Sequence, residues 1–133
     1  MIERDYLLRL LKQFFDGLNE LLFNIKTDDI EQAQFNIEAL YEKYFQHKRN
    51  FFIDNELPII NQVVINNDTQ SSAIKSEMLA ELLLIDGNMK RSTKQRKNLL
   101  AKALFLFEYA EQNSNTYSEE RLNKITSLKN DLG

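Results

Sequence analysis

Two stretches of this chain decide its fold: M-L-A-E-L-L-L-I-D-G-N-M at residues 78–89 and L-L-A-K-A-L-F-L-F-E-Y-A-E-Q at residues 99–112. In both stretches apolar residues recur every three or four positions, the spacing that gathers them on one face of an α-helix. In the first stretch and just before it, these positions are Ile74, Met78, Leu79, Leu82, Leu83 and Ile85. We therefore predict a helix here that ends at Gly87 in a left-handed cap.

The composition of the whole chain also favours helices. Of its 133 residues, three are Gly, one is Pro and none is Cys. Gly and Pro are too scarce for the turns of a hairpin-rich sheet, and the lack of Cys excludes disulfides and cysteine nucleophiles. We expect an all-α fold of about six antiparallel helices arranged as helical hairpins, with an α-helical bundle as the alternative.

The N-terminal part of the chain predicts two of these helices. The first covers about residues 2–25, and its apolar arc is wide enough to contact two neighbours. The second begins at Asp28, which we expect to be its N-cap, with Glu31 completing an arrangement that resembles a capping box. His47, the single histidine, lies near the end of this helix, where a polar or cationic residue is typical of the helix terminus.

Two more helices are predicted from Pro58 and from a capping box. A short helix covers about residues 56–65, with Pro58 in its first turn. Thr116 and Glu119 have the spacing of a capping box and predict the start of the last helix. We expect one domain over residues 1–133. Within it lie an N-terminal hairpin (1–47), a repeat-like helix pair (78–112) and a C-terminal capping helix (116–132).

Charge and hydropathy indicate where the protein works. The formal net charge is −3, which does not favour a nucleic-acid partner. No run of about 18 apolar residues is present to span a membrane, and charged residues interrupt the first apolar segment, unlike a signal peptide. We expect a cytoplasmic protein.

The two quoted stretches resemble one tetratricopeptide repeat, in which small residues let two antiparallel helices approach closely. The matching residues are Ala80, Leu83, Gly87 and Met89 in the first helix and its turn, and Ala103, Phe107 and Ala110 in the second. The resemblance implies a helical groove that binds a segment of another protein.

The whole chain also resembles an uncharacterised bacterial family of small tetratricopeptide-like helical proteins. That family opens with M-I-x-x-D-Y-x-x-R and carries an A-E-L-L…D-G segment. The matching residues are Met1, Ile2, Asp5, Tyr6, Arg9, Ala80, Glu81, Leu82, Leu83, Asp86 and Gly87. This resemblance implies the fold and no particular activity.

The helix that we expect from Ser92 or Thr93 to about residue 112 is apolar on two sides. Its main face is accompanied by Leu104, Phe105 and Tyr109 on the other side. Such a helix is either central in the fold or covered by a partner. Leu104, Phe105 and Tyr109 are therefore the candidate protein-binding residues, and the partner would be another protein, a peptide or a second copy of the chain.

Two further groups of side chains have alternative interpretations. The only basic cluster, in which the helix macrodipole opposes some of the charges, is either a solvated loop or a patch for an anionic partner: Lys90, Arg91, Lys94, Arg96, Lys97 and Lys102. Aromatic residues outside the main stripes either seal loops or form an exposed patch: Phe23, Phe35, Phe51 and Phe52.

No catalytic, metal or cofactor site is predicted. Asp28, Asp29 and Glu31 are explained by helix capping, and His47 has no second histidine with which to form a metal site. We therefore expect no enzyme. The expected function is a protein–protein interaction module or adaptor, and the alternative is a homo-oligomeric structural protein without a separate ligand.

Overall fold

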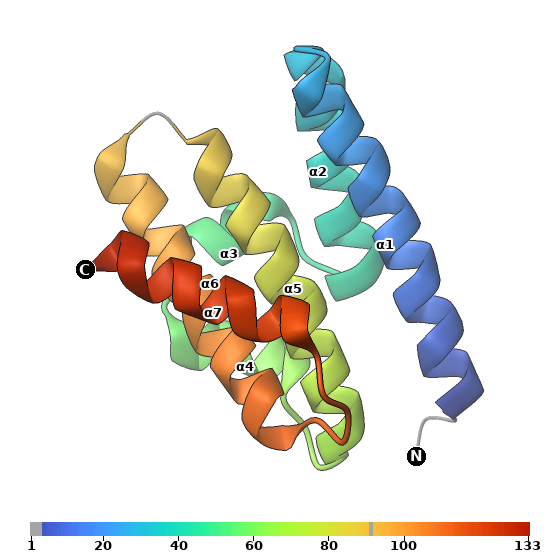
Figure 1. Cartoon of the computed structure of the whole chain (residues 1–133). Coiled ribbons are helices and arrows are strands. Elements are labelled where there is room, and N and C mark those ends of the chain that lie inside the picture. The colour runs from blue at the N-terminus through green and yellow to red at the C-terminus, as the bar shows by residue number, and fades with distance from the viewer. Residues whose placement is uncertain (1–3, 91) are drawn as a thin grey trace. The chain divides into compact units, whose positions relative to one another are not determined.

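The computed structural model describes residues 4–90 and 92–133, and over these residues the chain is all-α, as the sequence predicts (Figure 1). Met1, Ile2 and Arg91, named above, lie outside the described residues. The described part contains seven helices: α1 (Arg4–Lys26), α2 (Ile30–Phe45), α3 (Arg49–Asp54), α4 (Leu57–Val64), α5 (Thr69–Met89), α6 (Thr93–Asn113) and α7 (Glu119–Leu132).

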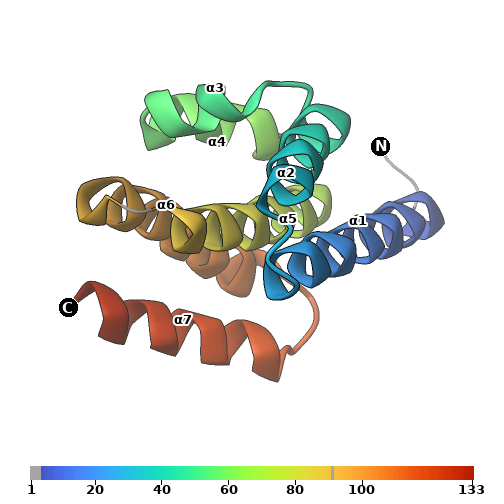
Figure 2. The ribbon, with the colours of Figure 1, turned by 90° about the horizontal axis from the view of Figure 1, so that it is seen from above.

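The chain divides into two compact units, Met1–Val63 and Val64–Gly133. In the first unit, α1 and α2 form an antiparallel hairpin (Figures 1 and 2). Its core is aromatic: the rings of Phe14 and Tyr44 form a T-shaped pair with centroids 5.1 Å apart. Tyr41 stacks on Phe52 of α3 with centroids 5.0 Å apart, which fixes α3 against α2.

The link between α1 and α2 corrects the predicted N-cap by one residue. Asp28 adopts a left-handed conformation, with φ of 61°. The N–H of Asp29 donates to the C=O of Asn24, and the N–H of Asp28 donates to the C=O of Ile25, which is the Schellman arrangement. Asp28 therefore ends α1, and Asp29 is the N-cap of α2, accepting a hydrogen bond from the N–H of Gln32.

The expectation of a single helix between α2 and α5 was incomplete, because α3 precedes α4. The N-cap residue of α3, Lys48, makes no side-chain capping bond, so the sequence carries no start signal. This six-residue helix instead has Phe52 fully buried and Arg49 buried with a hydrogen bond to Gln34 of α2. Pro58 lies in the first turn of α4, as expected.

In the second unit, α5 and α6 lie side by side and antiparallel, and α7 packs on α6 as a further layer (Figure 2). The predicted cap at Gly87 was wrong: α5 continues to Met89, and its C-cap is Lys90 in an extended conformation. Gly87 has a packing role. A Cβ atom at Gly87 would lie 2.9 Å from Cδ2 and 3.2 Å from Cγ of Leu100, so glycine permits the close approach of α5 and α6.

Serine and aspartate side chains begin the helices of this unit. Asp68 caps α5, Ser92 caps α6 and Ser118 caps α7, each by accepting a hydrogen bond from a backbone N–H three residues on. Ser92 is thus the cap among the two residues left open above. The predicted capping box at Thr116 was wrong, because Ser118 is the nearer competitor and α7 begins at Glu119.

Candidate functional site

A buried arginine on α7 holds the second unit together. Arg121 is 4% exposed. Its Nη1 donates to Glu77 of α5 at 2.8 Å and its Nε donates to Glu111 of α6 at 2.7 Å. Its Nη2 donates at 2.8 Å to the C=O of Thr116 in the α6–α7 loop. Burial opposes the charge, yet the two carboxylates prevail and raise the pKa of Arg121 above its ordinary value.

Two further ion pairs flank this arginine along α7. Lys124 pairs with Glu81 of α5, and Arg96 at the start of α6 pairs with Asp131 near the end of α7. Burial raises the pKa of Glu81, although its hydrogen bond to Lys124 acts in the opposite direction. The hydrogen bond from Arg96 lowers the pKa of Asp131. Two long charged side chains of α7, Arg121 and Lys124, thus connect it to α5.

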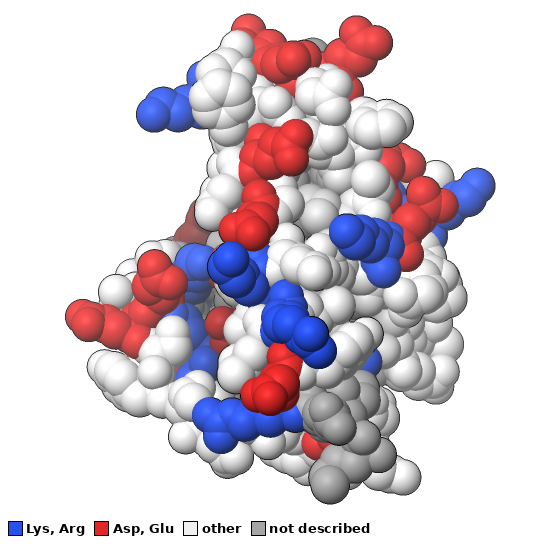
Figure 3. All heavy atoms as spheres, turned by 90° about the vertical axis from the view of Figure 1, so that its right-hand side faces the viewer, with Lys and Arg blue, Asp and Glu red and all other residues white. Residues whose placement is uncertain are grey.

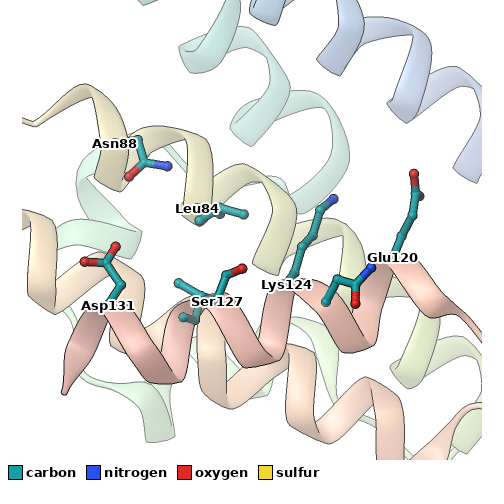
Figure 4. Close-up of a pocket in the computed structure, with 8 residues that line it drawn as sticks. Leu84, Asn88, Glu120, Lys124, Ser127 and Asp131 are labelled. Carbon is teal, nitrogen blue, oxygen red and sulfur yellow. The ribbon is translucent and has the colours of Figure 1, made fainter.

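This arrangement leaves an open groove of about 350 Å³ between α5 and α7 (Figure 4). Leu84 and Asn88 extend from α5 toward α7, from which Lys124, Ser127 and Asp131 extend toward α5. The groove exists because α7 packs on α6. The side of α7 that faces α5 therefore approaches it mainly through side chains. The full lining is Leu84, Asn88, Glu120, Asn123, Lys124, Ser127, Leu128 and Asp131.

The polar groups of the groove differ in how far they are already satisfied. Lys124 and Asp131 have ion-pair partners. Within residues 4–90 and 92–133, the side chains of Asn88, Asn123 and Ser127 have no hydrogen-bond partner. An asparagine amide offers both donors and an acceptor, as a peptide group does. The groove can therefore hydrogen-bond a neutral polar segment.

The predicted protein-binding residues do not line this groove, which is built from α5 and α7. Leu104, Phe105 and Tyr109 lie on α6. Phe105 is 43% exposed, and Leu104 and Tyr109 are half-buried. The main apolar face of α6 is fully packed, and its buried members are Leu99, Leu100, Ala103, Leu106, Phe107 and Ala110.

The predicted basic cluster is divided in the structure. Lys94 and Lys97 are exposed. Lys90 pairs with Asp86 at 3.7 Å, and Arg96 pairs with Asp131 on the groove side. Arg91 is outside the described residues, and the cluster's remaining member, Lys102, is buried.

The aromatic residues set aside above separate into two kinds. Phe52 is fully buried, and the half-buried Phe51 stacks on His47 with centroids 3.9 Å apart. Phe23 and Phe35 are 63% and 69% exposed. On the face shown in Figure 3, basic and acidic side chains are interleaved, and neutral surface lies between them.

Sequence reasoning did not identify the groove or the arginine beneath it. One signal was present: Arg121 stands four residues before Ile125 and seven before Leu128, on the apolar stripe of α7. A charged residue on a buried stripe needs partners, but the sequence does not say which ones.

The fold and this groove define a small all-α protein whose second unit carries an open cleft lined by charged, neutral polar and apolar side chains. No protein-family model matches the chain, and no curated protein or solved structure is significantly similar to it. Over the residues that the structure describes, no helix is long and apolar enough to cross a membrane. The same residues contain no group of three or more His, Asp and Glu side chains placed to hold a metal ion.

Proposed function

We propose that this protein is a protein-interaction module or adaptor, not an enzyme, that binds an extended segment of another protein in the α5–α7 groove. One observation carries the proposal. Asn88, Asn123 and Ser127 present hydrogen-bonding groups without partners beside the apolar Leu84 and Leu128. Lys124 and Asp131 are already paired, and Glu120 is the one charged lining residue without an ion pair within the described residues, so the groove favours a neutral peptide backbone over an anionic ligand.

The dimensions of the groove support a short peptide. Its lining on α7 runs from Glu120 to Asp131, a distance of about 16 Å at about 1.5 Å per residue. An extended chain covers this length with about five residues at roughly 3.3 Å each. The asparagines would bind the peptide backbone, and Leu84 would contact one apolar side chain.

The tetratricopeptide-like relationship and a cytoplasmic site of action belong to the same proposal. The structural support for the tetratricopeptide-like relationship is the antiparallel α5–α6 pair. Of the residues that carry the resemblance there, Met89 is half-buried and the others are buried: Ala80, Leu83, Gly87, Ala103, Phe107 and Ala110.

The proposal is tested by selecting peptides from a random library against the whole chain. The affinity of a selected, fluorescently labelled peptide is then measured by anisotropy. The double variant Asn88→Ala, Asn123→Ala removes two hydrogen bonds that contribute about 1 kcal/mol each. We expect its Kd to rise by about tenfold or more.

The matched control is Asn130→Ala, which changes an exposed asparagine of α7 that does not line the groove. It should leave the peptide affinity unchanged. If no peptide is selected, or if the selected peptides bind the double variant as tightly as the original chain, the groove is not the binding site.

A further inference from the structure

The outer face of α2 carries charge of one sign around an exposed aromatic ring. Phe35 is 69% exposed, and Glu31, Glu38 and Glu42 are exposed as well. At about 100° per residue, the three carboxylates fall within about 60° of Phe35, all on one side of it. None of the three forms an ion pair within the described residues. In contrast, exposed side chains of α1 carry both signs, with Arg9 and Lys12 followed by Asp16 and Glu20. Both signs are also present on the face shown in Figure 3.

The first half of α6 presents the opposite charge around a similar apolar centre. Lys94, Lys97 and Ala101 are exposed, and Phe105 is 43% exposed. Neither lysine forms an ion pair within the described residues, although Lys97 is close enough to Asp131 to help lower its pKa. Lys94 also stands in the first turn of α6, where the helix macrodipole disfavours a cation. A neighbouring carboxylate would relieve this cost.

The two faces match in register when the helices run antiparallel. Glu42 lies seven residues after Phe35, and Lys94 lies seven residues before Ala101. With Phe35 placed opposite Ala101, Glu42 and Lys94 therefore stand opposite each other, each about 10 Å along its helix axis from the Phe35–Ala101 pair. The bulky ring would fit against the small alanine, beside Phe105.

The second pair of charges agrees with the same register. Glu38 lies three residues after Phe35, and Lys97 lies four residues before Ala101, so they differ by about 1.5 Å along the axis. Glu38 is rotated about 60° from Phe35, and Lys97 about 40° from Ala101 in the same sense. When two helices face each other in antiparallel orientation, residues rotated in the same sense from the contact line lie on the same side of the interface. Glu38 and Lys97 therefore meet.

We infer that α2 of one copy of this protein packs antiparallel on α6 of a second copy, through Glu42–Lys94, Glu38–Lys97 and the ring of Phe35 on Ala101. The partner that binds the acidic face of α2 around Phe35 is thus a second copy of this chain. In a two-fold dimer the contact forms twice, which adds to its strength. The surface is separate from the α5–α7 groove, so this inference stands or falls independently of the proposed peptide binding.

The inference is tested by sedimentation equilibrium of the whole chain over a range of concentrations. We expect a monomer–dimer equilibrium that weakens as salt is added, because exposed charges are screened. Glu42→Lys and Lys94→Glu should each raise the dimer Kd by about fivefold to tenfold. Combining the two reversals should restore the original Kd, since the pair is re-formed with opposite sign.

The control reversal is Lys12→Glu, an exposed cation of α1, which should leave the dimer Kd unchanged. Phe35→Asp should leave only monomer, and circular dichroism should show that it stays folded because Phe35 is mostly exposed. A chain that is monomeric at every concentration overturns the inference. So does a dimer whose Kd is insensitive to both single reversals, or one that the double reversal fails to restore.

Discussion

Replacing Arg121 by methionine gives the most direct check on how the second unit is held together. The substitution keeps an unbranched apolar stem but removes a guanidinium that is 4% exposed and bonded to Glu77, Glu111 and the C=O of Thr116. Removing one partner of a buried ion pair costs about 3–5 kcal/mol. Because the side chains of Glu77 and Glu111 are 24% and 33% exposed, water replaces part of the loss. We expect a decrease of about 3 kcal/mol in the free energy of unfolding.

The assay is urea unfolding followed by circular dichroism, and hydrogen exchange localises the loss to residues 64–133. Lys129→Met on the same helix is the matched control. Its ammonium lies 3.6 Å from Glu108, and its side chain is 59% exposed, so its removal should cost about 1 kcal/mol or less. If Arg121→Met costs no more than Lys129→Met, the reasoning about a buried electrostatic clamp is refuted.

Three further predictions concern glycines and a buried carboxylate. Gly87→Ala should lower the free energy of unfolding by about 1–3 kcal/mol in urea titrations, because both Cγ and Cδ2 of the fully buried Leu100 stand in the way of a Cβ atom. Gly17→Ala should be neutral or stabilising by up to about 1 kcal/mol in the same titrations, because only Cδ2 of Leu40 is close and that side chain borders solvent; a loss as large as that of Gly87→Ala would contradict this. The raised pKa of Glu81 means that the folded state binds the proton of this carboxyl group more tightly than the unfolded state does. The stabilisation of the folded state that follows is fully present below the ordinary pKa of 4.5 and is lost as pH rises through the raised pKa. Unfolding titrations across this range should therefore show the original chain losing stability relative to Glu81→Gln as pH rises, and a constant difference would count against the burial argument.

Periodicity and capping residues predicted the helical class well, because both act locally. The apolar spacing around Met78 and Leu82, and the capping serine at Ser92, correspond to helices in the structure. Local reasoning failed where two neighbouring residues compete for one role. Asp29 rather than Asp28 caps α2, and Ser118 rather than a residue two positions earlier caps α7.

The remaining features depend on contacts that periodicity does not encode. The short α3 has no capping side chain and owes its place to the burial of Phe52. Gly87 was interpreted as a helix end, although the nearness of Leu100 explains why this position holds a glycine. The groove exists because α7 packs on α6. The apolar pattern of α7 showed that Arg121 would need partners, but it did not show which carboxylates these would be. Helices were thus predictable, while their lateral partners were not.

The turn between α1 and α2 has a consequence for experiments on the native state. Thr27, Asp28 and Asp29 connect two helices at the protein surface, yet all three of their amides are hydrogen-bonded to carbonyl groups of α1. Amide protons in surface connections usually exchange rapidly with solvent, whereas these should exchange only when the end of α1 opens. An inserted tag or protease site here would have to break the whole arrangement, so this surface connection is a poor place for either.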